Sequence, residues 1–296
     1  MERIVMSLAI IDADSLYFRI CYKTKSKKEI RKNIELILSE IERETFMSDM
    51  KIAVKGRGNW RKEYYPEYKK NRKELEPDLK EALNYAHNHL VKKYGAIQAD
   101  GMEADDLVSI WAYEAREMEI PYIIVGIDKD LLQIPGNHYN FVKREHQFID
   151  DDMAYRKLML QCLTGDNSDN IPGIKGIGPK KAEKIFGNAT NDRLWTLVRA
   201  AWEMHGAGKP DVSYRLLKML TDWEEYDKVQ RSIKSKTTES EQSMEPERVQ
   251  EVQVSGLQEV PDTSEGTTEG SGVAVREGSE VKPETNSGSV QLSIGS

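Results

Sequence analysis

Residues 163–182, LTGDNSDNIPGIKGIGPKKA, carry the most informative signal in the chain. Asp166 and Asp169 stand three residues apart, and paired carboxylates at this spacing suit a divalent metal ion. The glycine-rich turn that follows opens a lysine-rich helix, where free backbone N–H groups favour an anion such as phosphate. A metal site beside a phosphate site indicates nuclease chemistry.

The turn at residues 173–181 combines three glycines with three lysines. Glycine permits positive φ and lets the backbone approach a phosphate closely, and the lysines add positive charge. Nothing in the turn is suited to reading base edges, so we expect binding that is independent of sequence and sensitive to salt. The glycine spacing and the missing Lys-Ser/Thr exclude a P-loop. The candidate DNA-binding residues here are Gly173, Lys175, Gly176, Gly178, Lys180 and Lys181.

Three more acidic clusters lie upstream, each beside the end of a predicted element. Any one of them is also explained by a turn or a helix cap. Together they predict one pocket of hard oxygen ligands, which prefers Mg²⁺, with Mn²⁺ as a substitute, over zinc. Two such ions suit phosphodiester hydrolysis. With Asp166 and Asp169, the candidate ligands are Asp12, Glu103, Asp105, Asp106, Asp128 and Asp130.

The apolar pattern predicts an α/β fold. Alternating strands and helices imply a mostly parallel, Rossmann-like sheet flanked by helices. Ligands bind beyond the carboxyl ends of such strands, so Asp12 and Asp128 should converge. We expect strands at 4–11, 51–54 and 122–127, and helices at 27–46, 78–94, 104–118, 153–163, 180–186, 192–204 and 213–223.

Charge divides the chain of 296 residues into two parts. Residues 232–296 hold five basic and twelve acidic residues, which leaves 38 of each in residues 1–231. The segment after Arg231 also lacks aromatic residues and any apolar period, so we expect 232–296 to be a disordered acidic tail. A passive extension is favoured over a decoy for the DNA-binding surface or a segment that binds a replication partner.

Cysteine content and hydropathy restrict the class of protein further. Cys21 and Cys162 are too few for a disulfide framework or a zinc site. The sequence has no signal peptide and no apolar run near 18 residues. We therefore expect a soluble, cytoplasmic, monomeric protein that does not contact membranes.

Five blocks together resemble the flap endonuclease-like 5′-nucleases, which include bacteriophage 5′→3′ exonucleases with ribonuclease H activity and the 5′-nuclease domain of bacterial DNA polymerase I. The glycine-turn block is the most specific of the five, and the order of the blocks is that of the family. The resemblance covers roughly residues 4–230. The blocks are IIDADSLYFR (10–19), NWRKEYYPEYKKNR (59–72), GMEADD (101–106), IDKDLLQI (127–134) and GDNSDNIPGIKGIGPKKA (165–182).

The resemblance implies a PIN-like nuclease domain at 1–150 with a helical arch at about 60–90, and a helix-three-turn-helix region at 151–231. It implies two Mg²⁺ sites and a K⁺ at the Gly173–Gly178 turn. By position, Lys69 and Arg72 would contact the scissile phosphate, and Arg19, Arg61 and Lys70 would bind DNA. The implied substrates are 5′ flaps, nicked or branched duplexes and RNA–DNA hybrids, acted on in the cytoplasm, or in the host cytoplasm for a phage protein.

One departure from the family pattern bears on catalysis. Family members carry an aspartate just after the second strand, where this chain has Lys55. A lysine cannot ligate Mg²⁺ and would repel it, although Asp14 is an extra acid nearby that would substitute. The alternative function is therefore a branched-DNA-binding protein with weakened or lost catalysis. A third reading, a toxin-like ribonuclease, leaves the 163–182 block unexplained.

Overall fold

The structure, a computed structural model, describes residues 6–242 of the chain. Six strands form one sheet in the order β3-β2-β1-β4-β5-β6. Neighbouring strands are parallel except for β6, which runs antiparallel to β5. This confirms the predicted α/β fold with a mostly parallel sheet. The strands are β1 Leu8–Asp12, β2 Asp49–Lys55, β3 Ile97–Ala99, β4 Tyr122–Val125, β5 Gly136–Asn140 and β6 Glu145–Ile149.

Strand β1 lies at the centre of the sheet, paired with β2 on one side and β4 on the other. Its sequence, LAIID, is buried along its whole length, as expected for a strand covered on both faces. The chain leaves β1 toward β2 and later returns to β4 on the other side. The carboxyl end of β1 is therefore the topological switch point, where ligands bind in open α/β sheets.

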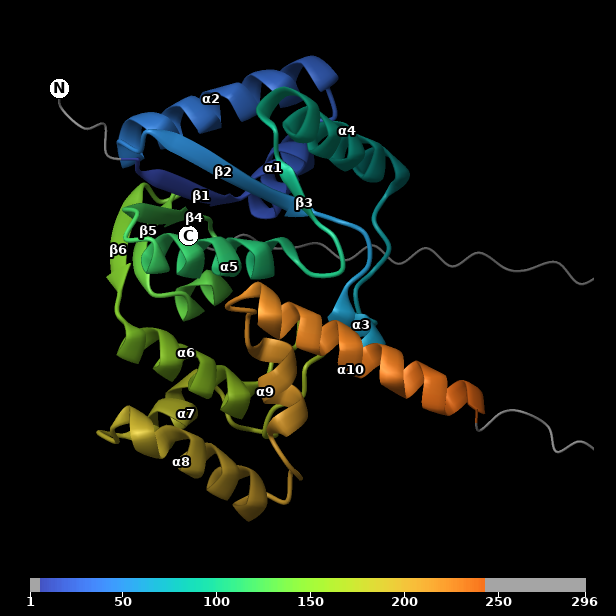
Figure 1. Cartoon of the computed structure of the whole chain (residues 1–296), viewed down its shortest axis with the longest axis vertical. Helices are drawn as coiled ribbons and strands as arrows, with labels where there is room; N and C mark the ends of the chain where they lie inside the picture. The colour runs from blue at the N-terminus through green and yellow to red at the C-terminus, as the bar shows by residue number, and fades with distance from the viewer. Residues whose placement is uncertain (1–5, 243–296) are drawn as a thin grey trace, which may run out of the picture. The chain divides into compact units, whose positions relative to one another are not determined.

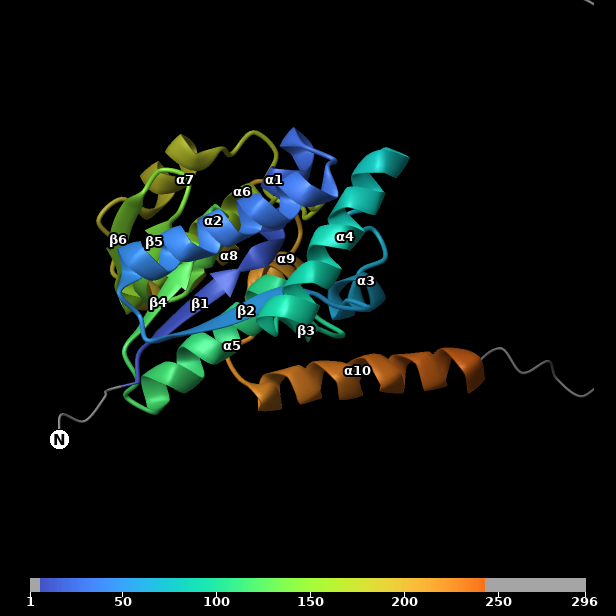
Figure 2. The same ribbon diagram turned by 90° about the horizontal axis from the view of Figure 1, so that it is seen from above.

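Helices cover both faces of the sheet (Figures 1 and 2). In the 27–45 helix, apolar residues at spacings of three and four place Ile30, Ile34, Leu38 and Ile41 on one buried face. One face of the sheet carries α1 Ala13–Lys23, α2 Lys27–Thr45 and α4 Pro77–Tyr94. The other carries α3 Trp60–Tyr64, α5 Ala104–Glu117 and α10 Trp223–Gln242.

A helical region with its own core follows β6 and fills the lower half of Figure 1. Phe186, Leu194 and Trp202 are buried there, and the Trp202 indole N–H donates to the Cys162 carbonyl at 2.9 Å. The predicted boundary near residue 150 falls at the N-cap of its first helix, but the described residues 6–242 belong to a single compact unit. The helices are α6 Asp151–Thr164, α7 Pro179–Phe186, α8 Asn191–Met204 and α9 Asp211–Leu217.

The predicted helix at 213–223 is correct as far as residue 217 but extends too far, and the predicted start of the tail at 232 is too early. Helix α9 ends at Leu217, and α10 begins at Trp223 and continues to Gln242. The segment between them turns toward α5, where the Leu220 N–H donates to Asp106 at 3.1 Å. Residues 232–242 are thus helical, and the prediction of disorder for 243–296 falls outside the described residues.

The segment predicted to be a helical arch is partly core. It comprises α3, a loop at 65–76 and most of α4. Four residues of α4, Leu79, Ala82, Ala86 and Leu90, are buried against α1, α2 and the sheet. Only the 65–76 loop therefore remains to form an arch. Within residues 6–242, no helix combines the length and apolarity needed to cross a membrane.

Truncation tests the revised tail boundary. A chain ending at Gln242 should keep the melting temperature of the full chain, because every described contact is retained. A chain ending at Arg231 loses Ile233, which is 9% exposed, and burial of such a side chain contributes about 1.5–3 kcal/mol. We expect its melting temperature to fall by roughly 4–10 °C in a calorimetric scan. Equal melting temperatures for the two truncated chains would contradict the packing of α10.

Candidate functional site

Two acids meet where β1 and β4 end. Asp12 closes β1 and caps α1, accepting the Asp14 N–H at 3.1 Å, and Asp128 caps the 3-10 helix Lys129–Gln133, accepting the Asp130 N–H at 2.9 Å. Gly126 allows this approach: a Cβ there would lie 2.3 Å from the Leu131 side chain and 3.6 Å from the Asp12 Cβ. The predicted convergence of Asp12 and Asp128 is observed.

The negative charge of Asp12, Asp128 and Asp130 is only partly balanced by nearby positive groups. Burial, reinforced by the charges of Asp14 and Asp128, raises the pKa of Asp12 to about 7. Burial and the charge of Asp128 raise the pKa of Asp130 to about 6, although Lys157 lies 3.7 Å away. Raised carboxyl pKa values mean that the ionised form is poorly stabilised. A cation placed between these groups would relieve both.

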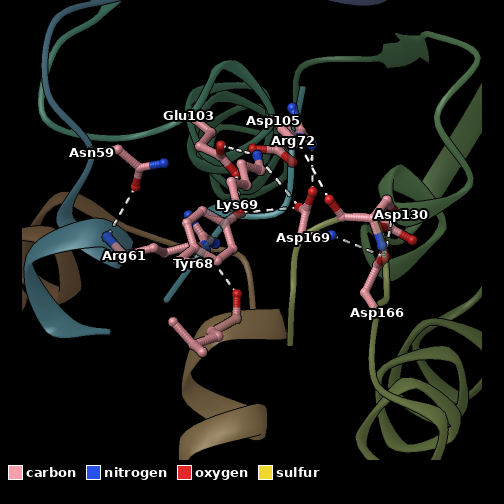
Figure 3. A network of polar contacts seen from close by, with 12 residues as sticks. Asn59, Arg61, Tyr68, Lys69, Arg72, Glu103, Asp105, Asp130, Asp166 and Asp169 are labelled. Carbon is pink, nitrogen blue, oxygen red and sulfur yellow. Dashed lines mark hydrogen bonds and ion pairs between the residues drawn. The ribbon is translucent and has the colours of Figure 1, made fainter. Parts of the chain in front are cut away.

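The 65–72 loop brings basic residues against the acids at 103 and 169 (Figure 3). The Tyr68 hydroxyl lies 2.7 Å from Glu103 and 3.1 Å from Asp169. The Lys69 ammonium pairs with Glu103 and lies 3.4 Å from Asp169, which also pairs with Arg72. Although burial opposes ionisation, the charges of Lys69 and Arg61 lower the pKa of Glu103 to about 2.

Backbone contacts hold this loop against the 166–170 turn. The Lys69 N–H donates to the Asp169 carbonyl at 2.8 Å, and the Asn71 amide donates to the Asn167 carbonyl at 2.6 Å. In the other direction, the Asn170 amide donates to the Glu67 carbonyl at 2.7 Å. Lys69 has φ of 58°, a left-handed conformation that a non-glycine residue adopts at a cost of order 1–3 kcal/mol. The contacts on both sides hold it there.

Asp105 is the acid between the two groups described above, the acids that follow β1 and β4 and the acids at 103 and 169. It is half-buried, and burial together with the charges of Glu103 and Asp106 raises its pKa well above the usual value. Asp166 lines the same pocket and accepts the Ser168 N–H at 2.7 Å. The pocket's side chains include Tyr68, Glu103, Asp105, Asp130, Asp166 and Asp169.

The chemistry of the donor set, though not its present geometry, suits a hard divalent cation. Its members are carboxylates from four separate segments, and Lys69 already places one cation between Glu103 and Asp169. Among residues whose side chains are described, no three carboxylate, imidazole or thiol groups converge on one point. The sequence therefore predicted which acids gather in one region. In the structure, Lys69 and Arg72 hold two of these acids, Glu103 and Asp169, in ion pairs.

Two predicted site residues have a different role. Asp106, predicted as a metal ligand, is 0% exposed, and Arg61, predicted to bind DNA, is 2% exposed. They form a two-pronged ion pair, with Arg61 Nη2 at 2.9 Å from Asp106 Oδ1. Asp106 also accepts the backbone N–H of Glu103 at 3.2 Å, and Arg61 donates to the Leu216 carbonyl at 2.7 Å. Both side chains are fully engaged inside the protein, which argues against both assignments.

The glycine turn is built as expected at one of its three glycines. Gly176 has φ of 79° and open space around its Cα, and the Lys181 ammonium donates to its carbonyl at 2.8 Å. Gly178 is extended with φ of −98° and caps α7. Gly173 packs on Thr164, where a Cβ would lie 2.2 Å from backbone. Its lack of a side chain therefore serves internal packing, and of the three glycines only Gly176 uses the positive φ that glycine permits.

The remaining predicted DNA-binding side chains lie at the surface. Lys175 and Lys180 are exposed beside the turn, Arg19 is exposed on α1, and Lys70 is exposed with Glu67 at 2.8 Å. The sequence did not single out Tyr68, Lys157 or Gln161, whose amide donates to Asp130 at 2.7 Å. Tyr68 could have been found as the aromatic neighbour of Lys69. The other two carry no sequence signal, because only α6 packing brings them to the site.

Lys55 lies at the end of β2 with an exposed side chain. Its N–H donates to Asp14 at 2.8 Å, and its carbonyl lies 2.9 Å from the His87 ring. The same Asp14 oxygen accepts the Tyr17 hydroxyl at 2.7 Å. Burial raises the pKa of Asp14, while Tyr17 and Lys55 act in the opposite direction. Asp14 thus stands beside Asp12, and whether it replaces the missing ligand stays a prediction.

Residues 7–159 match a family model described as 5′-3′ exonuclease, N-terminal resolvase-like domain. The chain is 35% identical over 140 residues to the flap endonuclease Xni of Shewanella baltica, which covers 43% of this chain and 52% of that protein. It is 36% identical over 139 residues to DNA polymerase I of Borreliella burgdorferi. This match covers 43% of this chain and 15% of that protein. The match thus spans about half the length of the Xni relative.

Solved structures from bacteriophage T5 share the fold. A T5 flap endonuclease in a pseudo-enzyme–product complex with DNA and metal ions matches with a TM-score of 0.58 and 20% identity, covering 73% of this chain and 89% of that one. A T5 5′-exonuclease with bound zinc ions also has a TM-score of 0.58 and 20% identity, with coverage of 77% and 98%. These likenesses agree with the predicted PIN-like architecture.

The Arg61–Asp106 pair generates a test of its structural role. Arg61→Met should lower the free energy of unfolding by about 3–5 kcal/mol, because it leaves the Asp106 carboxylate buried without its cation. Lys62→Met is the matched control, since Lys62 is the exposed next residue of α3, and its effect should stay within about 0.5 kcal/mol. Urea denaturation measures both. An unchanged free energy in Arg61→Met would restore the DNA-contact assignment.

Proposed function

The chain belongs to the 5′-3′ exonuclease family, and from this premise we propose that it is a metal-dependent 5′-nuclease. It hydrolyses phosphodiester bonds at 5′ ends and flaps, or in RNA–DNA hybrids, during DNA replication. The observation that carries the proposal is the acid-walled pocket, with Lys69 and Arg72 beside it. Asp130 in its wall connects it to Asp128 at the carboxyl edge of the sheet. Acids alone would hold a metal ion, whereas acids with adjoining cations also suit a phosphate.

We assign two Mg²⁺ ions, replaceable by Mn²⁺, to the pocket. Such ions, when bound, stabilise charge on the phosphate and lower the pKa of water. The raised pKa values of Asp12 and Asp130 support the assignment, because a cation would stabilise the ionised form of both. Asp106 is left out, since its pair with Arg61 occupies it. The assigned ligands are Asp12, Glu103, Asp105, Asp128, Asp130, Asp166 and Asp169.

The loop cations orient the phosphodiester. Lys69 and Arg72 now pair with Glu103 and Asp169, and a substrate phosphate offers the same two cations charge-assisted hydrogen bonds. Tyr68 keeps Glu103 and Asp169 in place through its hydroxyl while the cations shift partner. The left-handed backbone at Lys69 points the side chain to this shared position.

The glycine turn holds the duplex backbone downstream of the cut. Gly176 exposes its backbone, and Lys175 and Lys180 extend into solvent on either side. At the α7 N-terminus Pro179 has no N–H, and the Lys181 and Ala182 N–H groups donate to the Gly178 carbonyl. The Lys180 N–H remains for a phosphate, which would be held without reading of bases. We retain K⁺ at this turn, action as a monomer in the cytoplasm and a replication partner for the tail as predictions from the resemblance.

A labelled 5′-flap substrate incubated with Mg²⁺ or with EDTA tests the proposal. Cleavage that needs Mg²⁺ or Mn²⁺ supports it. Lys55 at the end of β2 favours the second candidate, a branched-DNA-binding protein with weakened catalysis. Tight binding without cleavage at any concentration of either metal would establish that candidate, and a Lys55→Asp variant should then gain metal affinity.

Asp128→Asn tests the metal role with little risk to folding, since Asp128 is exposed. Cleavage should fall by on the order of 100-fold or more, because a neutral amide is a poor ligand for Mg²⁺. DNA binding should remain within about twofold in a fluorescence anisotropy titration. Asp49→Asn, an exposed acid at the amino end of β2, is the control and should cleave normally. Full turnover in Asp128→Asn would refute the assignment.

Lys180→Gln tests the duplex grip. Binding should weaken on all sequences alike, and the slope of log K against log salt should fall by about 1, because one phosphate contact is lost. The rate at saturating DNA should not change. Lys92→Gln, an exposed lysine in the last turn of α4, removes the same charge far from the turn and should leave the slope intact. A slope unchanged in Lys180→Gln would place the duplex elsewhere.

A further inference from the structure

The short loop between β3 and α5 carries Glu103 into the pocket, and the 57–60 segment holds one side of it. The Gly101 N–H donates to the Arg57 carbonyl at 2.7 Å, and the Trp60 N–H donates to the Gly101 carbonyl at 2.9 Å. The Arg57 N–H in turn donates to the Asp100 side chain at 2.7 Å. Both polar backbone groups of Gly101 are thereby fixed, two residues before Glu103.

Helix α10 covers the other side of the same loop. The Tyr226 hydroxyl donates to the Asp100 carbonyl at 3.2 Å. Gly101 has φ of 77°, and a Cβ built on it would lie 2.4 Å from the Tyr226 oxygen and 3.3 Å from the Gln230 amide nitrogen. The tyrosine tip therefore rests on the bare Cα of Gly101. A side chain there would have to displace it.

Packing already anchors α10 without this hydroxyl. Val229 and Ile233 are buried in the core that α5 shares with the sheet. The Trp223 indole N–H donates to Glu114 at 2.8 Å, toward the far end of α5. A phenylalanine at 226 would supply the same ring to this interface. The hydroxyl is thus in excess of what docking of the helix requires, and its hydrogen bond goes to the loop that carries Glu103.

The segment before Tyr226 joins that loop to the glycine turn. The Ser213 hydroxyl on α9 donates to the Pro172 carbonyl at 2.7 Å, next to the turn. Leu216 and Lys218 then accept hydrogen bonds from Arg61 through their carbonyls, at 2.7 and 3.2 Å. The chain continues directly into α10 and Tyr226. One continuous stretch thus contacts both the duplex-binding turn and the acid loop.

We propose that Tyr226 is a positioning residue for the metal pocket: its hydroxyl fixes the Asp100–Gly101 backbone and so holds Glu103 where a metal ion needs it. The inference rests on the proposed function, since it assigns a purpose to a residue that is remote from the substrate. Tyr226 touches no acid of the pocket, and acts only through the backbone of the loop.

Tyr226→Phe and Trp223→Phe form a matched pair for the test. Each removes one hydrogen bond from α10 to the α5 side of the molecule, and each keeps an aromatic ring. Only the hydrogen bond of Tyr226 goes to the loop that carries Glu103, whereas that of Trp223 goes to Glu114. Three quantities are measured on the full chain: Mn²⁺ affinity without DNA by electron paramagnetic resonance, amide hydrogen exchange at residues 101–105, and the melting temperature.

In Tyr226→Phe, Mn²⁺ affinity should fall by about 3- to 10-fold, the loss expected for one net hydrogen bond. Amide exchange at 101–105 should speed up by a similar factor, and KM for DNA should stay unchanged. Trp223→Phe should lower the melting temperature as much as Tyr226→Phe does. Its Mn²⁺ affinity and its amide exchange at residues 101–105 should equal those of the unaltered protein.

The outcomes separate the two claims. A Tyr226→Phe protein with unchanged exchange at 101–105, or two variants that lose Mn²⁺ affinity equally, would overturn the positioning role. An unaltered protein that neither binds Mn²⁺ nor cleaves a 5′ flap would overturn the proposed function instead. Faster exchange in Tyr226→Phe alone, with Mn²⁺ affinity unchanged, would show that the loop loosens without consequence for the pocket and would also reject the proposal.

Discussion

The buried ion pair between Arg61 and Asp106 is the interaction on which the rest of the site depends. Both side chains are almost fully excluded from solvent, and the pair joins α3 to the first turn of α5. Backbone groups also hydrogen-bond to the pair, and they belong to Glu103, Leu216, Lys218 and Leu220. A buried ion pair is weak support for stability in itself, but its strict geometry fixes which segments meet. The ion pair therefore also fixes the positions of the acids next to Asp106, which are Glu103 and Asp105.

The acids of the candidate site fall into two electrostatic states, and the difference lies in their neighbours. Glu103, in the pocket, has Lys69 beside it, and its pKa is lowered. Asp12, outside the lining of that pocket, is buried beside Asp14 and Asp128, and its pKa is raised. One half of the site is thus neutralised by the protein's own cations, while the other half is not. The unneutralised half gains most from a divalent ion, and the neutralised half has cations that a phosphate can share.

The sheet and its acidic edge could be predicted because both follow from local rules. Apolar runs mark buried strands, and parallel topology brings their carboxyl ends together, so Asp12 and Asp128 could be paired across the sequence. The role of Asp106 could not, because three acids in four residues look alike until the rotation of α5 is known. Which acid turns inward was decided by Arg61, 45 residues earlier, and by a carbonyl 155 residues from that arginine.

The contacts between the acid loop and residues 216–226 also set an order of assembly. Synthesis runs from the amino terminus, so Glu103 and Asp105 emerge long before the segment that closes around Arg61 and Asp106. The carbonyl of Asp100 meets Tyr226 later still. A ribosome-bound chain therefore already contains all the acids of the candidate site before residues 216–226 are present to hold them in place. For the proposed nuclease, this arrangement would delay completion of the site until translation of the folded unit is nearly finished.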